Sequence, residues 1–113
     1  FIVAIGNNKI RQEVFTSFKK NLLPATIVHP SAIIGSDVTL GEGTVVLANA
    51  VINASARIGN NTIVNSRVVI DHDCVVGNHI HLSIGTMVGS TSEIADGYLS
   101  AIGENINSFS KIG

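Results

Sequence analysis

The sequence predicts an all-β main domain in which short strands alternate with regularly placed corners around a narrow core. Aliphatic side chains recur at every sixth position from Val28 to Ile112, with Ser100 as the one exception. A second register, two residues earlier, consists mostly of Ala, Ser, Thr, Cys or Val. Most aliphatic positions are followed by Gly, Asn or Asp, which tolerate turns. Neither an α-helix nor a plain strand has a period of six, so corners must interrupt the strands.

The first 24 residues do not share this period and predict a strand, a turn and a helix. The apolar run FIVAIG ends in glycine, and KIRQEVFTSFKKN places Ile10, Val14, Phe15 and Phe18 on one helical side. Asn8 is the expected N-cap. A lone strand and helix cannot bury both faces, so residues 1–24 are expected to end a small α/β, Rossmann-like domain. Residues 25–113 then form the main domain, in a segment of a longer protein whose coil continues.

Composition excludes several classes of protein. Seven Lys and Arg against eight Asp and Glu give a net charge of −1, so there is no bulk positive field for a nucleic acid. No apolar run approaches the roughly 18 residues that span a bilayer, and a single cysteine cannot form an internal disulfide. The start lacks the pattern of a signal peptide. We expect a cytoplasmic protein with no nucleic-acid or membrane partner.

The period of six resembles that of hexapeptide-repeat proteins, which fold as a left-handed parallel β-helix. In that family three repeats make one triangular turn, so residues 18 positions apart stack. The stacking expected here forms three inner columns: Ile34, Ile52, Ile70, Val88, Ile106; Leu40, Ile58, Val76, Ile94, Ile112; and Val28, Val46, Val64, Leu82, Ser100.

The residues just before the inner aliphatics point outward and define three outer faces. Two faces are apolar and one is mostly polar. The faces carry Ile33, Val51, Val69 and Met87; Val45, Ile63, His81 and Leu99; and Thr39, Arg57, Val75 and Glu93. A threefold assembly would bury two faces of each prism, so the pattern predicts a homotrimer. The alternative is scattered surface aliphatics with no partner.

The polar residues concentrate between positions 69 and 82. His72 and Asp73 occupy the two corner positions of one repeat, where side chains project outward near a neighbouring subunit. A neutral imidazole can take a proton from an amine or hydroxyl, and an adjacent carboxylate can orient it. This arrangement suits direct acyl transfer. Asp71 is a competing carboxylate, and a solvated His-Asp pair without chemistry is the alternative reading.

Three motifs carry a closer resemblance: AIGNN before an IR-containing helix, HPSA at the start of the coil, and VNSRVVIDHDCVVGNHIHLSIG. The chain is similar to sugar acetyltransferases of the sialic acid O-acetyltransferase type, which include bacterial UDP-4-amino-sugar N-acetyltransferases of the bacillosamine pathway. The resemblance implies transfer from acetyl-CoA, without a metal, to a nucleotide sugar or sialic acid in bacterial surface glycan biosynthesis.

The same resemblance implies roles for seven residues. His72 matches the general base and Asp73 the acidic neighbour that raises its basicity. His81, Ser90 and Ile102 match positions that contact acetyl-CoA. The substrate-binding positions are Gly6 and Asn65. Ala101 stands where relatives often have glycine, so the groove that binds the pantetheine arm of acetyl-CoA is expected to be reshaped there.

The remaining candidates have simpler interpretations. His29 and His79 are expected to be polar corner residues, Cys74 a core residue, and Arg57 and Arg67 solvated. Two rival functions stay open. A zinc carbonic anhydrase of the γ type would need a histidine spacing that His72, His79 and His81 do not show, and a structural coil would have kept the fold without the chemistry.

Overall fold

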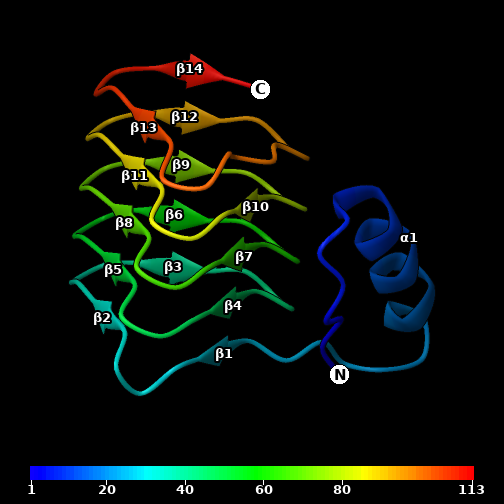
Figure 1. Ribbon diagram of the computed structural model, residues 1–113. Coiled ribbons are helices and arrows are strands. Elements are labelled where there is room, and N and C mark those ends of the chain that lie inside the picture. The colour runs from blue at the N-terminus through cyan, green and yellow to red at the C-terminus, as the bar shows by residue number, and fades with distance from the viewer.

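The computed structural model describes residues 1–113 and shows a three-sided parallel β-solenoid with one helix beside it (Figure 1). The helix, α1, spans Asn8–Lys19, and no helix of the chain is long and apolar enough to cross a membrane. Fourteen two-residue strands follow: β1 Ile27–Val28, β2 Ile33–Ile34, β3 Thr39–Leu40, β4 Val45–Val46, β5 Val51–Ile52, β6 Arg57–Ile58, β7 Ile63–Val64, β8 Val69–Ile70, β9 Val75–Val76, β10 His81–Leu82, β11 Met87–Val88, β12 Glu93–Ile94, β13 Asn105–Ile106 and β14 Lys111–Ile112.

The strands stack into three parallel sheets, one for each side of the solenoid. Their orders are β1-β4-β7-β10, β2-β5-β8-β11-β13 and β3-β6-β9-β12-β14. In the second sheet Ile52 pairs with Ile34 on one side and with Ile70 on the other, which are the neighbours that the sequence pattern predicts. The predicted fold class, a left-handed parallel β-helix, is confirmed.

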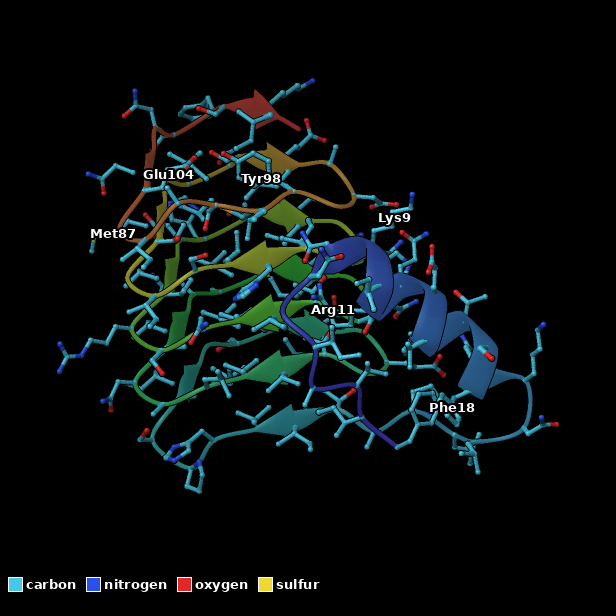
Figure 2. All side chains as sticks on the ribbon, turned by 45° about the vertical axis from the view of Figure 1, so that its right-hand side comes forward. Lys9, Arg11, Phe18, Met87, Tyr98 and Glu104 are labelled. Atoms are coloured by element: carbon cyan, nitrogen blue, oxygen red, sulfur yellow. The ribbon has the colours of Figure 1, made fainter.

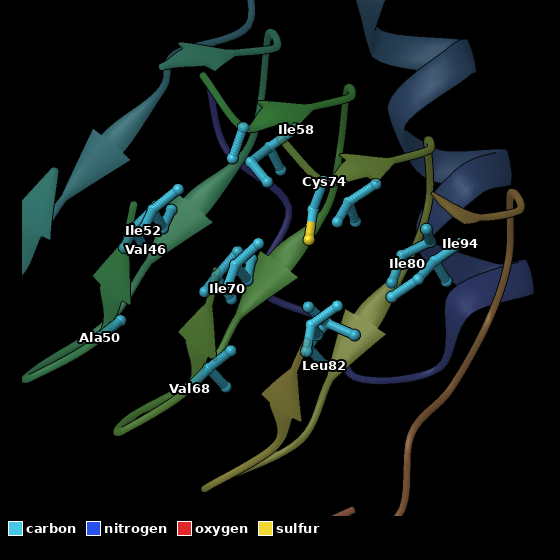
Figure 3. Close-up of a cluster of buried hydrophobic side chains, with 14 of the residues drawn as sticks. Val46, Ala50, Ile52, Ile58, Val68, Ile70, Cys74, Ile80, Leu82 and Ile94 are labelled. Atoms are coloured by element: carbon cyan, nitrogen blue, oxygen red, sulfur yellow. The ribbon is translucent and has the colours of Figure 1, made fainter. Parts of the chain in front are cut away.

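The core is a column of branched aliphatic side chains inside the solenoid (Figure 3). Ile52, Ile70 and Leu82 have no exposed surface, and neither do Ala50 and Cys74 from the register of smaller residues. Large and small side chains therefore alternate along each side and fill the narrow interior, as close packing requires. Both predicted inner registers are confirmed through the central turns.

The corners use two kinds of residue for two different tasks. A residue with positive φ recurs every six positions from Asp37 to Phe109, and nine of these residues are not glycine. The glycines that directly follow inner aliphatic residues lie two positions before these positive-φ residues. They have a different task, which is to let the backbone of the next turn come close. A Cβ on Gly59 would lie 2.4 Å from Asn78 Oδ1, which accepts a hydrogen bond from the backbone N–H of Asn60 at 2.7 Å. These glycines therefore bring successive turns together, and the bend itself lies elsewhere in the repeat.

The exception in the aliphatic column, Ser100, is buried and satisfied by hydrogen bonds. Its hydroxyl accepts from the Ser83 backbone N–H at 2.8 Å and lies 2.7 Å from the Thr86 hydroxyl. Nearby, Tyr98 donates to Glu104 at 2.5 Å. Only an isolated bridge between His81 and Leu99 forms there, so the first sheet has four strands where the others have five.

Residues 1–6 do not form the strand that the sequence predicts. They run along the side of the solenoid made by β4, β7 and β10, where Val3 is buried. Phe1 O accepts from Ala25 N at 2.7 Å, and no ladder of backbone hydrogen bonds follows. A strand forms only where a partner pairs its backbone groups, so the predicted strand is wrong here and no Rossmann-like unit is seen. The division at residue 24 stays a prediction.

The predicted helix is confirmed, but its cap and its buried face differ from expectation. The N-cap is Asn7, whose Oδ1 accepts from Ile10 N at 2.9 Å. Asn8 instead donates its side-chain amide to the coil, at Gly97 O and Tyr98 O. The buried side chains of α1 are Arg11 and Phe15, whereas Ile10 and Phe18 are about half exposed.

Candidate active site

The corner between β8 and β9 presents the predicted base and its carboxylate. His72 Nδ1 lies 2.9 Å from Asp73 Oδ2, and both side chains are more than half exposed. Asp73 has a φ of +58°, and its N–H donates to Ala54 O in the adjacent turn at 3.0 Å. The turn thus fixes the carboxylate beside the ring. With Nδ1–H donated to Asp73, His72 Nε2 carries the lone pair that a general base needs.

The competing carboxylate, Asp71, does not contact the imidazole. Its Oδ1 accepts from the His72 backbone N–H at 2.8 Å and from Asn53 Nδ2 at 3.0 Å. These hydrogen bonds, the backbone one foremost, lower the pKa of Asp71 below its usual value. Asp71 therefore stabilises the corner, and Asp73 is the carboxylate that orients the ring.

A second group of predicted residues meets on the first side of the solenoid. His81 Nδ1 lies 3.2 Å from Gly6 O, and His81 Nε2 lies 3.2 Å from Asn65 Nδ2. A carbonyl only accepts and an amide N–H only donates, so this geometry fits the tautomer of His81 with its proton on Nδ1 and a lone pair on Nε2. The three residues line a cavity of about 300 Å³ that residues 2–6 cover with apolar side chains. The fold thus joins residues 75 positions apart.

The two groups lie on different parts of one chain. His72 follows β8 of the second sheet, whereas His81 belongs to β10 of the first sheet, and no hydrogen bond joins the two side chains. Ser90 sits one turn beyond His72 at the same corner, where Thr91 N donates to His72 O at 3.0 Å. Ile102 is highly exposed at the corner after the first sheet, where the neighbouring Gly103 N donates to Ile84 O. The chain alone therefore assembles two partial sites.

Sequence reasoning missed Arg11, which lies between α1 and the solenoid (Figure 2). Its guanidinium is 1% exposed and donates to five oxygens, one of them Gly6 O. Burial lowers its pKa to about 10. The available signal was its spacing: Arg11 is one helical turn from Phe15, the apolar residue that is buried.

The other candidates have structural surroundings. Burial raises the pKa of the Cys74 thiol, which donates to Gly89 O at 3.1 Å inside the core and confirms the expected core role. His79 packs edge-on against Phe15, accepts from Asn61 Nδ2 at 2.8 Å, and has a pKa lowered by burial. Arg57 and Arg67 are exposed. No three side chains of His, Cys, Asp or Glu gather where they would hold a metal ion.

Comparison with solved structures identifies the architecture. The acetyltransferase domain of PglB from Neisseria gonorrhoeae is 30% identical, with a TM-score of 0.69 over 97% of this chain and 57% of its own. PerB from Caulobacter crescentus, solved with CoA and GDP-perosamine, is 32% identical, with a TM-score of 0.68 over 97% of this chain and 56% of its own. The fold is that of the hexapeptide-repeat sugar acetyltransferases.

A third solved structure supports the fold alone. WeeI from Acinetobacter baumannii superposes with a TM-score of 0.72 over 99% of this chain and 66% of its own, at 17% identity. The chain spans somewhat more than half the length of PglB's domain and of PerB. No family model and no curated protein matches the chain.

Proposed function

We propose that this chain is the coil of an acetyl-CoA-dependent acetyltransferase that acetylates the amino group of a nucleotide-linked sugar. The observation that carries the proposal is the His72-Asp73 pair, in which His72 Nδ1 lies 2.9 Å from Asp73 Oδ2 while Nε2 makes no hydrogen bond within the chain. The solved relatives support the class of substrate, because PerB was crystallised with CoA and GDP-perosamine. They favour N-acetylation over the O-acetylation of sialic acid that the sequence left open.

The mechanism is direct transfer within a ternary complex. His72 Nε2 accepts a proton as the sugar nitrogen attacks the carbonyl carbon of the acetyl thioester. The new C–N bond forms, the C–S bond breaks, and the CoA thiolate leaves and takes up the proton. A backbone N–H near the thioester would stabilise the negative charge that develops on its oxygen. Histidine is also the residue replaced in two structures of the Caulobacter enzyme, which supports this choice of base.

The remaining predicted residues would bind the two substrates. His81, Ser90 and Ile102 are proposed to contact acetyl-CoA, and Gly6 and Asn65 the nucleotide sugar. The cavity lined by Gly6, Asn65 and His81 supports a binding role for this side of the solenoid, since it combines apolar walls with the polar side chains of Asn65 and His81. The acetylated sugar would enter a bacterial surface glycan, and the reaction would take place in the cytoplasm, where acetyl-CoA is made.

A homotrimer would complete the site. The two partial sites lie on different sides of one chain, so a neighbouring copy must bring His72 to the cavity at His81. The outer face of the sheet that contains β2 and β11 supports such an assembly, because Ile33 and Met87 are 62% and 52% exposed on it. On the face made by β4, β7 and β10, residues 2–6 already cover part of the predicted contact surface, so the exposed Leu99 and its surroundings would contribute most there.

The test is an acceptor panel on the full-length protein. Thiol release from acetyl-CoA is followed with several 4-amino nucleotide sugars and with sialic acids. Release with an amino sugar, absent from a His72→Ala variant, is expected. Release with sialic acids alone would replace N-acetylation by O-acetylation, and no release together with no CoA binding would favour the structural coil.

A further inference from the structure

Arg11 is a buried cation whose partners are all neutral. Its side chain is 1% exposed, and no carboxylate forms a salt bridge with it. Five oxygens accept its N–H groups: Ile5 O at 2.9 Å, Gly6 O at 3.2 Å, Asn8 Oδ1 at 2.7 Å, Asn61 O at 3.1 Å and Ile80 O at 3.1 Å. Burying a charge is unfavourable unless hydrogen bonds replace water, and here every guanidinium nitrogen has such a bond.

These five acceptors come from parts of the chain that are distant in sequence. Ile5 and Gly6 belong to the N-terminal segment, Asn8 begins α1, and Asn61 and Ile80 lie at one corner of two successive turns of the solenoid. A planar guanidinium holds its donors in fixed directions. Arg11 therefore fixes the Gly6 carbonyl relative to the solenoid, which neither the segment nor the helix does alone (Figure 2).

The Gly6 carbonyl is shared with His81. It accepts from Arg11 Nη1 and from His81 Nδ1, each at 3.2 Å. The chain of hydrogen bonds continues as Asn65 Nδ2 donates to His81 Nε2 and Asn65 Oδ1 accepts from Ser66 N at 2.8 Å. Both ends of this chain are backbone groups of fixed polarity, so every bond in it has one possible direction. The second N–H of the Asn65 amide takes no part in this series of hydrogen bonds.

We infer that Arg11 is a positioning residue that holds the Gly6 carbonyl and, together with Asn65, keeps His81 in the Nδ1–H tautomer, so that one N–H of Asn65 pairs with His81 and the other is left for a ligand. An N–H donor at this point favours a hydrogen-bond acceptor on the ligand, such as a carbonyl or hydroxyl oxygen. The consequence for acetyl transfer rests on the proposed function, whereas the tautomer does not.

The test reads the His81 ring directly. Ring-nitrogen NMR spectra of ¹⁵N-histidine-labelled full-length protein distinguish the two neutral tautomers, and a His81→Gln variant assigns the signal. The wild type is expected to show Nδ1–H at His81. Arg11→Met, of similar length without the donors, is expected to show mixed or Nε2–H tautomers, whereas Arg57→Met, at an exposed arginine, leaves the signal unchanged. Arg11→Lys keeps the charge but lacks the planar guanidinium with its fixed donors. Its share of the Nδ1–H tautomer is expected to lie between those of the wild type and Arg11→Met.

Two results would overturn the inference. One is a wild-type His81 protonated on Nε2, and the other is an unchanged Nδ1–H signal in a folded Arg11→Met or Arg11→Lys protein. The wild-type and lysine spectra decide the question even if the methionine variant fails to fold. In the acetylation assay, Arg11→Lys is expected to reduce kcat/KM at least about tenfold while the pH dependence set by His72 is retained. A correct tautomer in a protein without acetyl transfer would reject the proposed function and keep the positioning role.

Discussion

The corner at His72 and the cavity at His81 use histidine in opposite ways. His72 is more than half exposed and takes its orientation from the next residue in the chain. His81 is half-buried, and its two ring nitrogens bond to residues 75 and 16 positions away. A ring with an open nitrogen is suited to moving a proton, whereas a ring with both nitrogens engaged is suited to orienting a neighbour. Under the proposed function, proton transfer belongs to a corner of the solenoid at His72 and ligand positioning to strand β10 at His81.

Replacing His72 by alanine is expected to have the largest effect. Loss of a general base lowers kcat by roughly 10²–10⁴-fold, and initial rates of thiol release measure this. His29→Ala is the matched control, because His29 is an exposed corner histidine whose ring bonds only to nearby Ser31. A His72→Ala enzyme with nearly full kcat would remove this residue from the chemistry.

Replacing Asn65 by alanine is expected to cause the second-largest loss of activity. The variant removes the N–H donor and leaves His81 Nε2 unpaired. The value of kcat/KM is expected to fall by about 10- to 100-fold, because one hydrogen bond to the substrate is lost and the substrate is held less accurately. Steady-state kinetics against both substrates measures it, with Asn21→Ala, at an exposed residue after α1, as the control. Equal kinetics for the two variants would mean that the cavity does not bind substrate.

Replacing Asp73 by asparagine is expected to have a smaller effect. The pair is exposed to water, which weakens its electrostatic part, so a fall in kcat of about tenfold is expected from poorer orientation of the ring. Asp71→Asn is a close control, because that neighbouring carboxylate bonds to the backbone and to Asn53 but not to the imidazole. A larger loss in Asp71→Asn than in Asp73→Asn would exchange the two roles.

The solenoid could be predicted because its pattern repeats. Each aliphatic position constrains the next, so an exception such as Ser100 does not disturb the register, and Ile34, Ile52 and Ile70 stack as expected. The His72-Asp73 contact was also accessible, since it joins adjacent residues at a corner. A contact between adjacent residues can be predicted without knowing how the rest of the chain folds.

Features that depend on long-range contacts could not be predicted. The strand expected for residues 1–6 is absent because its backbone finds no sheet partner, which hydrophobicity alone cannot show. The helix faces the coil with Arg11, because carbonyl groups of distant turns satisfy its donors. For the same reason the bonds from His81 to Gly6 and Asn65 appear only once the turns are stacked.

Mixed oligomers test the central claim, that one copy supplies His72 and its neighbour supplies the cavity at His81. Full-length His72→Ala and His81→Ala chains are each expected to be inactive alone. Co-expressed in equal amounts, they are expected to recover about a quarter of the wild-type rate, because that share of interfaces joins an intact His72 to an intact His81. No recovery in mixed oligomers, confirmed to contain both chains, would contradict a site shared between copies.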